Sequence, residues 1–264
     1  MDTPQQPTAS SPATPALSGA LPDLGTLFRS AFALYRTHLS RLLTLELILI
    51  IPTIILTVFA ITAIAGSLAI PFFGFSGLLG EATSGGWNFF GWTTGLFLFI
   101  AVIAAFVTAW QQGSVLLFLR DPKTSYGEIL KRALTMTPRV GIVAFLLSLA
   151  VILGFLVFFL PGIYLWVLFS QVVVVAVYEG LGTAAFRRSR ELVAGHWWWV
   201  FGVTIAYTIL IGVVSAILTS IAGAASDAAE TVVSLLVSFF LAPLGVCFAY
   251  TLYHALRSAR GKAV

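Results

Sequence analysis

Residues 139–190 decide the fold, and they read RVGIVAFLLSLAVILGFLVFFLPGIYLWVLFSQVVVVAVYEGLGTAAFRRSR. No lysine or arginine lies between Arg139 and Arg187. The interval holds two apolar runs, 140–160 and 163–178, joined at Leu160-Pro161-Gly162. A helix rises about 1.5 Å per residue and the hydrocarbon core of a bilayer is about 30 Å thick. The stretch therefore predicts a helical crossing, a tight outer turn and a return crossing.

The basic residues of the whole chain follow the same rule. All 14 lysines and arginines fall into four clusters, which are Arg29/Arg36/Arg41, Arg120/Lys123/Lys131/Arg132/Arg139, Arg187/Arg188/Arg190 and Arg257/Arg260/Lys262. Each cluster is separated from the next by a pair of apolar stretches that enclose no basic residue. Because loops rich in lysine and arginine stay in the cytoplasm, the pattern predicts six transmembrane helices with both termini cytoplasmic.

The six predicted spans have definite positions in the chain. They are residues 42–70, 95–119, 140–160, 163–178, 197–222 and 232–253, and the fourth is short for a full crossing. A long outer connection, 71–94, carries Trp87 and Trp92, whose indoles suit the headgroup level. The apolar runs lack the strict alternation of β-barrel strands, so helices are favoured. The expected fold is an all-α membrane protein.

Composition agrees with that fold. The chain has 264 residues, of which 59% are hydrophobic and only 9% charged, so a soluble enzyme is excluded. The net charge of +4 comes from residues that flank apolar segments, so it indicates lipid headgroups rather than nucleic acid. A Pro/Ser/Thr-rich stretch, 1–22, is expected to be a disordered cytoplasmic tail, 23–258 the transmembrane domain, and 259–264 a C-terminal tail.

An amphipathic segment precedes each of the three pairs of spans. The segments are residues 23–41, 125–134 and 181–193, each with an apolar stripe at helical spacing opposite its basic residues. Asp23 is the expected N-cap of the first, and Ser125 with Glu128 has the capping-box spacing. The architecture thus predicts three hairpins, each preceded by a cytoplasmic interfacial helix. The alternative is that these helices only cap the bundle.

Part of the chain resembles a known group of membrane proteins. The residues concerned are LPGIYL at 160–165, VVVAVYEG at 173–180, AFRRSREL at 185–192 and GHWW at 195–198. This pattern is similar to the membrane domain attached to some glycerophosphoryl diester phosphodiesterases, a widespread and largely uncharacterised prokaryotic family. The resemblance covers residues 160–201 and implies a membrane fold in the inner membrane of a prokaryotic cell. It implies no enzyme activity, because the soluble catalytic barrel of the fused phosphodiesterases has no counterpart here.

Few ionisable residues lie inside the predicted spans. Glu46 is the clearest. It is expected either to have a structural role, in an ion pair with Arg41 or by snorkelling to water, or to be a functional carboxylate. Glu179 is expected to interact with the start of the third surface helix or with a neighbouring arginine. The remaining polar residues are expected to form interhelical hydrogen bonds or to line a polar cavity, and they include Gln111, Gln112 and Gln171.

No catalytic motif, cofactor motif or metal-binding spacing is present in the sequence. The three histidines lie in separate segments, and the single cysteine, Cys247, excludes an intrachain disulfide. Residues Trp197, Trp198 and Trp199 are expected to anchor the fifth span at the interface rather than form a cage for a cationic ligand. The protein is therefore not expected to be an enzyme.

Two functions remain open. The first is a scaffold or accessory protein that binds anionic lipid or a membrane partner, a second copy included. Its headgroup contacts would be Arg29, Arg187, Arg188 and Arg190. The second is a transporter of lipids or small molecules. Its pathway would use Pro52 and Pro243 as helix breaks, and the residues lining it would be Glu46, Gln111, Gln112 and Gln171.

Overall fold

A computed structural model describes the backbone of residues 21–72 and 86–260, and the side chains of residues 21–65 and 94–260. The described residues form helices and no strand; the helices are α1 (Leu24–Thr37), α2 (Leu39–Phe72), α3 (Gly86–Arg120), α4 (Tyr126–Val157), α5 (Phe159–Leu168), α6 (Val172–Tyr178), α7 (Ala184–Ala194), α8 (Trp197–Gly223) and α9 (Asp227–Arg260). Within this part of the chain, six segments are long and apolar enough to cross a membrane. The predicted all-α membrane fold is confirmed.

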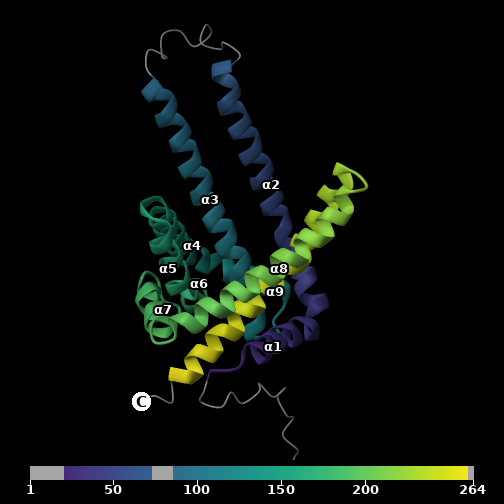
Figure 1. Ribbon diagram of the computed structural model, residues 1–264, viewed down its shortest axis with the longest axis vertical. Coiled ribbons are helices and arrows are strands. Elements are labelled where there is room, and N and C mark those ends of the chain that lie inside the picture. Colours follow the sequence, from purple (N-terminus) through teal and green to yellow (C-terminus); the bar gives the residue numbers. More distant parts are fainter. Residues whose placement is uncertain (1–20, 73–85, 261–264) are drawn as a thin grey trace, which may run out of the picture.

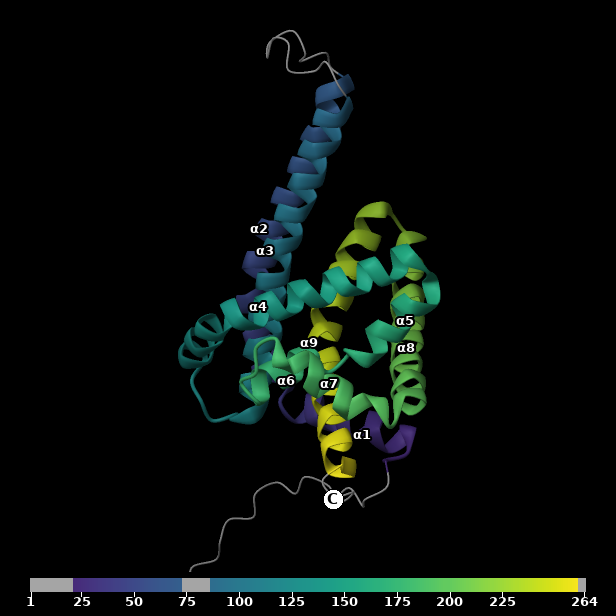
Figure 2. The same ribbon diagram turned by 90° about the vertical axis from the view of Figure 1, so that its left-hand side faces the viewer.

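The long helices project from one common end of the molecule (Figure 1). This end is formed by α1, α7, the α3–α4 connection and the last turns of α9 (Figures 1 and 2). We call this end, together with the first turns of α4 that follow the connection, the basic end. Its basic residues are Arg29, Arg36, Lys123, Lys131, Arg132, Arg187, Arg188, Arg190, Arg257 and Arg260. Away from it, α2 with α3 and α8 with α9 extend as two separate pairs, and α4 crosses obliquely between them (Figure 2).

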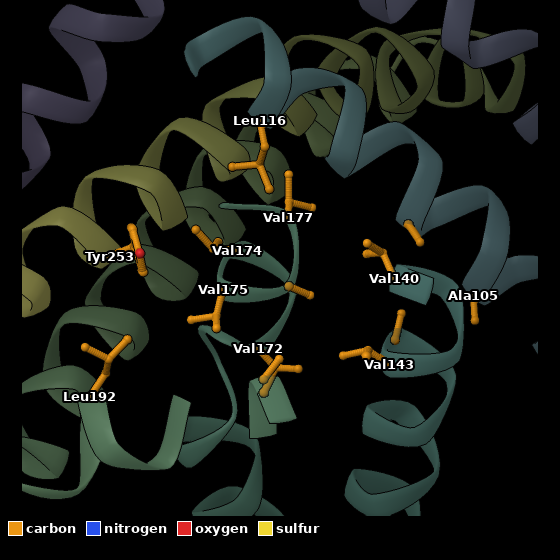
Figure 3. Close-up of a cluster of buried hydrophobic side chains, with 14 residues drawn as sticks. Ala105, Leu116, Val140, Val143, Val172, Val174, Val175, Val177, Leu192 and Tyr253 are labelled. Carbon is orange, nitrogen blue, oxygen red and sulfur yellow. The ribbon is translucent and has the colours of Figure 1, made fainter. Parts of the chain in front are cut away.

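The short helix α6 lies at the centre of the packed region. It contacts α3, α4, α7 and α9, and Figure 3 shows its valines among side chains from all four. Five of its seven residues, Val172 and Val174–Val177, are buried. A helix that is apolar on every side must be enclosed by protein or lipid, and here protein encloses it.

The fourth predicted span is not one helix. It is interrupted at Phe169–Gln171, between α5 and α6. The carbonyl of Leu168 accepts a hydrogen bond from the Ser189 hydroxyl at 3.0 Å, and that of Val167 accepts from the Ser170 amide at 3.2 Å. A break is tolerated because these groups are satisfied inside the protein. The breaks expected at Pro52 and Pro243 are absent, since α2 and α9 continue through both residues.

The turn between α4 and α5 also differs from the prediction. Phe158 is extended, with φ −166° and ψ 149°, and Leu160-Pro161-Gly162 lies in the first turns of α5 instead of forming the connection. Proline is tolerated there because the amide it lacks would have no partner in the first turn of a helix. Gly162 lets α5 approach α4 closely: its Cα would lie 3.0 Å from a β-carbon placed at Gly154.

The second surface segment is not a separate interfacial helix. Residues 126–157 form the single helix α4, which continues through Pro138. The reason is that Ile129, Ala133, Thr137 and Val140 make one buried stripe across the proline. The capping box was also wrong: the side chain of Ser125 makes no capping hydrogen bond, and Glu128 instead accepts a 2.6 Å hydrogen bond from Arg132.

The first surface segment folds as α1 and packs along α9. Its N-cap is confirmed, because Asp23 Oδ2 accepts a hydrogen bond from the Gly25 amide at 3.3 Å. Leu27, Ala31 and Tyr35 are buried at a spacing of four residues, and the Tyr35 hydroxyl donates to the Phe240 carbonyl of α9 at 2.9 Å. The apolar face of α1 is therefore covered by protein, as the capping alternative requires.

Several predicted boundaries shift by a few residues. Two helices extend into the outer connection expected at 71–94: α2 ends at Phe72, and α3 begins at Gly86. The helix α9 reaches Arg260, two residues into the C-terminal tail expected at 259–264. Residues 1–20 and 261–264 of the two predicted tails, and the side chains of Trp87 and Trp92, lie outside the described part of the structure.

Candidate functional site

A polar cluster at the basic end is built around Glu179, directly after α6. Its Oε1 accepts a 2.8 Å hydrogen bond from the Tyr253 hydroxyl of α9, and its Oε2 lies 3.1 Å from Arg188 Nε of α7. Glu191 adds a second carboxylate, 3.5 Å from Arg188 Nη1. Partial burial disfavours the charged guanidinium, but the two carboxylates outweigh this and raise the pKa of Arg188. The predicted pairing of Glu179 with a neighbouring arginine is confirmed.

The backbone next to Glu179 is held from a second side. Gly180 has φ +66°, a left-handed conformation that glycine adopts without the steric cost of a β-carbon. Its carbonyl accepts a 2.9 Å hydrogen bond from Arg139 Nη1 of α4. The turn from α6 to α7 is thus held by two arginines, one at Glu179 and one at Gly180. Both Glu179 and Gly180 therefore have structural roles.

The four arginines predicted to contact headgroups have different surroundings. Arg188 is engaged by Glu179 and Glu191, and its side chain is 36% exposed. The side chain of Arg187 is 82% exposed and 3.8 Å from Glu191, a distance and an exposure at which an ion pair is weak. Arg29 and Arg190 are exposed and form no ion pair within the described residues. Three of the four are therefore open to an external anion.

The predicted intramembrane glutamines also divide. Gln111 of α3 donates to Thr53 Oγ1 at 2.6 Å and to the Leu49 carbonyl at 3.1 Å, both in α2, so the interhelical hydrogen bond is confirmed for this residue. Gln112 has no such bond among the described residues. Gln171 lies at the α5–α6 break and is 1% exposed. Its Oε1 accepts no hydrogen bond from any of the described residues.

Glu46 does not form the ion pair expected with Arg41. The Arg41 guanidinium instead donates to the carbonyls of Pro122 and Thr124 in the α3–α4 connection. It also lies 5.4 Å from the ring centroid of Phe118, a cation–π contact. These partners hold the guanidinium on the α3–α4 side. Glu46 is 8% exposed and has no ion pair within the described residues.

An open groove of about 1090 Å³ lies between α5 and the start of α8. Its lining is Leu160, Pro161, Ile163, Tyr164, Ala194, Gly195, His196, Trp197, Trp198, Trp199 and Phe201. The Trp197 ring stacks on Tyr164 at 5.6 Å and on Phe201 at 5.2 Å between centroids. Sequence reasoning missed this groove. Both of its walls carry aromatic residues, but only the packing of α5 on α8 brings them together.

These positions bear on the transport hypothesis. Neither Glu46 nor any of the three glutamines of the predicted pathway lines the groove. The Gln111 side chain is hydrogen-bonded to Thr53 of α2, whereas Gln171 lies in the broken span.

Throughout residues 21–72 and 86–260, no three His, Cys, Asp or Glu side chains gather closely enough to hold a metal ion.

The chain was compared with known families, curated proteins and solved structures. No family model, curated protein or solved structure matches it. The resemblance of residues 160–201 to the phosphodiesterase-associated membrane domain therefore stays a prediction from sequence.

Proposed function

We propose that this multi-pass membrane protein is a non-enzymatic scaffold or accessory protein of the inner membrane, and that its basic end binds anionic lipid headgroups from the cytoplasmic side. The contacts would be Arg29 on α1 with Arg187 and Arg190 on α7. Arg188 leaves the predicted set because Glu179 and Glu191 occupy its guanidinium.

One observation carries the proposal: exposed arginines without strong internal partners lie at the end from which apolar helices project (Figure 1). A basic side chain near an anionic membrane surface contributes about 1 kcal/mol to lipid attraction. The outer parts of the helices expose large apolar side chains such as Ile55, Ile61 and Ile221, as lipid contact requires. The arginines would lie where these helices enter the headgroup region.

The proposal is tested by removing the three charges together. The variant Arg29→Gln/Arg187→Gln/Arg190→Gln is reconstituted into vesicles, and tryptophan quenching by brominated phosphatidylglycerol is compared with quenching by brominated phosphatidylcholine. We expect the selectivity for phosphatidylglycerol to fall about a hundredfold, since three attractions of about 1 kcal/mol each are lost.

The matched control keeps the charges. The variant Arg29→Lys/Arg187→Lys/Arg190→Lys should retain the selectivity of the native protein, because surface attraction depends on charge more than on guanidinium shape. Native selectivity in the glutamine variant would reject the lipid role.

The second candidate, a lipid or small-molecule transporter, is favoured by the break between α5 and α6. Transporters place broken helices at their substrate sites, and Gln171 lies at the break with an unpartnered carbonyl oxygen. A transporter of lipid would speed the transbilayer movement of a fluorescent phospholipid in proteoliposomes, and Gln171→Leu would slow it. Movement no faster than in protein-free vesicles would remove lipid transport from consideration.

A further inference from the structure

We propose that the groove between α5 and α8 holds one acyl chain of a single anionic phospholipid, whose phosphate lies at Arg190. The inference rests on the proposed function and makes it specific. One lipid molecule would be retained at a defined position, distinct from the lipids that exchange around the helices.

The walls of the groove suit a hydrocarbon chain. Leu160, Ile163 and Tyr164 of α5 form one wall, and the aromatic residues of α8 form the other. The groove volume of about 1090 Å³ is slightly above the roughly 300–1,000 Å³ typical of small-molecule sites. A rigid, mainly apolar wall of this size binds a chain by burying its surface.

One end of the groove supplies the polar contacts. Ala194 and Gly195 line it at the end of α7, and Arg190 lies four residues before Ala194, on the same helix face. The Arg190 side chain is exposed and has no ion pair among the described residues. A phosphate at this end would therefore meet a free guanidinium.

Two nitrogens at the same end have unmet hydrogen-bonding capacity. Nδ1 of His196 and Nε1 of Trp197 are buried and have no partner in the described part of the chain. A buried N–H without an acceptor costs about 1–3 kcal/mol. Both residues line the groove, but protein covers the two nitrogens, so a bound headgroup would reach them only after their side chains turn toward it.

The groove surroundings favour a lipid over a soluble ligand. Leu160 is 67% exposed and Trp198 is 78% exposed, and both line the groove. Phe159, which precedes Leu160 in α5, is also 65% exposed. If α5 and α8 span the membrane, these exposed apolar side chains contact lipid chains. An acyl chain can then enter the groove laterally from the bilayer.

The test fills the groove without touching any charge. Gly195 lines the groove, has φ −75° and has nothing within 4 Å of an added β-carbon, so the β-carbon of Gly195→Leu meets open space. Gly202 in α8 also has nothing within 4 Å of an added β-carbon and does not line the groove, so Gly202→Leu is the matched control. Each purified protein is incubated with dioleoyl phosphatidylglycerol in detergent, and retained lipid is counted by native mass spectrometry.

We expect the native protein and Gly202→Leu to retain one phosphatidylglycerol, and Gly195→Leu to lose it. Arg190→Gln should lower the preference for phosphatidylglycerol over phosphatidylcholine. Equal retention by Gly195→Leu and Gly202→Leu would overturn the groove site. Inorganic phosphate that displaces the lipid completely would also overturn it, since the chain would then contribute nothing.

The outcomes separate this inference from the proposed function. If the triple glutamine variant loses selectivity in vesicles while Gly195→Leu keeps its lipid, the basic end binds headgroups and the groove holds no chain. If Gly195→Leu loses the lipid while the triple variant keeps its selectivity in vesicles, the groove binds a chain and the surface role of the arginines fails.

Discussion

The carboxylate of Glu179 connects three helices of the basic end. It follows α6, accepts the Tyr253 hydroxyl of α9 and pairs with Arg188 of α7. Tyr253 is fully buried, so its hydroxyl depends on this acceptor. Buried polar groups contribute little net stability when paired but cost much when one partner is removed. This residue is therefore where a single substitution should loosen the packing of α6, α7 and α9.

We expect Glu179→Ala to destabilise the protein by about 1–3 kcal/mol, because it leaves the buried Tyr253 hydroxyl without its acceptor. Glu191→Ala is the control: Glu191 also pairs with Arg188, but its side chain is 45% exposed, so its loss should cost under about 1 kcal/mol. Thermal unfolding in detergent measures both. Equal shifts in the melting temperature would show that the Glu179 contacts are not the stronger ones.

The bond from Gln111 to Thr53 gives a second prediction at this scale. A double-mutant cycle with Gln111→Leu and Thr53→Val should give a coupling of roughly 0.6 kcal/mol, the average for such bonds inside membranes. The same cycle with Gln112→Leu should give none, because no hydrogen bond joins Gln112 to Thr53. A coupling as large for Gln112 would mean that α3 is rotated from its described position.

The residue contacts that sequence could predict are the local ones. The pairing of Glu179 with an arginine was predictable, since the basic stretch that begins at Arg187 follows it closely. The contact with Tyr253 was not, because 74 residues separate the two. The Arg41–Glu46 pair failed for the same reason: Arg41 is bonded to carbonyls more than 80 residues away.

Among the elements, α4 and α5 are in unusually close contact. A β-carbon at Gly162 would lie 2.5 Å from Cγ of Phe155, and one at Gly154 would lie 3.0 Å from the Cα of Gly162. Small residues allow helix backbones in membranes to approach each other closely. The pair of glycines thus sets the approach of α5 to α4 and, through α5, the position of one wall of the groove.

We expect Gly162→Ala to cost about 1–3 kcal/mol, since the new methyl group overlaps the Phe155 ring. Gly212→Ala in α8 is the control, because nothing lies within 4 Å of its new β-carbon. That substitution should be neutral or stabilising by up to about 1 kcal/mol, as alanine favours helix over glycine. Unfolding in detergent distinguishes the two, and equal stability would place the α4–α5 contact elsewhere.

Hydropathy predicted which segments are helices, since long apolar runs have few alternatives in a bilayer. It did not predict where helices break or continue. The α5–α6 break is stabilised by a hydrogen bond from Ser189, which belongs to the later helix α7. The helix α4 continues through Pro138 because its buried residues lie on both sides of the proline. Such outcomes are set by tertiary partners, which apolar composition does not reveal.

For the whole molecule, the basic clusters and the packed centre lie together, while the long helices project away (Figures 1 and 2). The connection between α8 and α9 is acidic by contrast, with Asp227 and Glu230 in the first turn of α9. Lysine and arginine are retained on the cytoplasmic side. We therefore expect the basic end to lie inside the cell and the α8–α9 connection outside.

Thiol labelling on intact cells tests this orientation most directly. In a Cys247→Ala background, Lys131→Cys reports on the basic end and Ala225→Cys on the α8–α9 connection; both native side chains are exposed. We predict that a membrane-impermeant maleimide applied from outside labels the cysteine at 225 in intact spheroplasts, and the one at 131 only after the membrane is broken. Labelling of position 131 in intact spheroplasts would contradict the account.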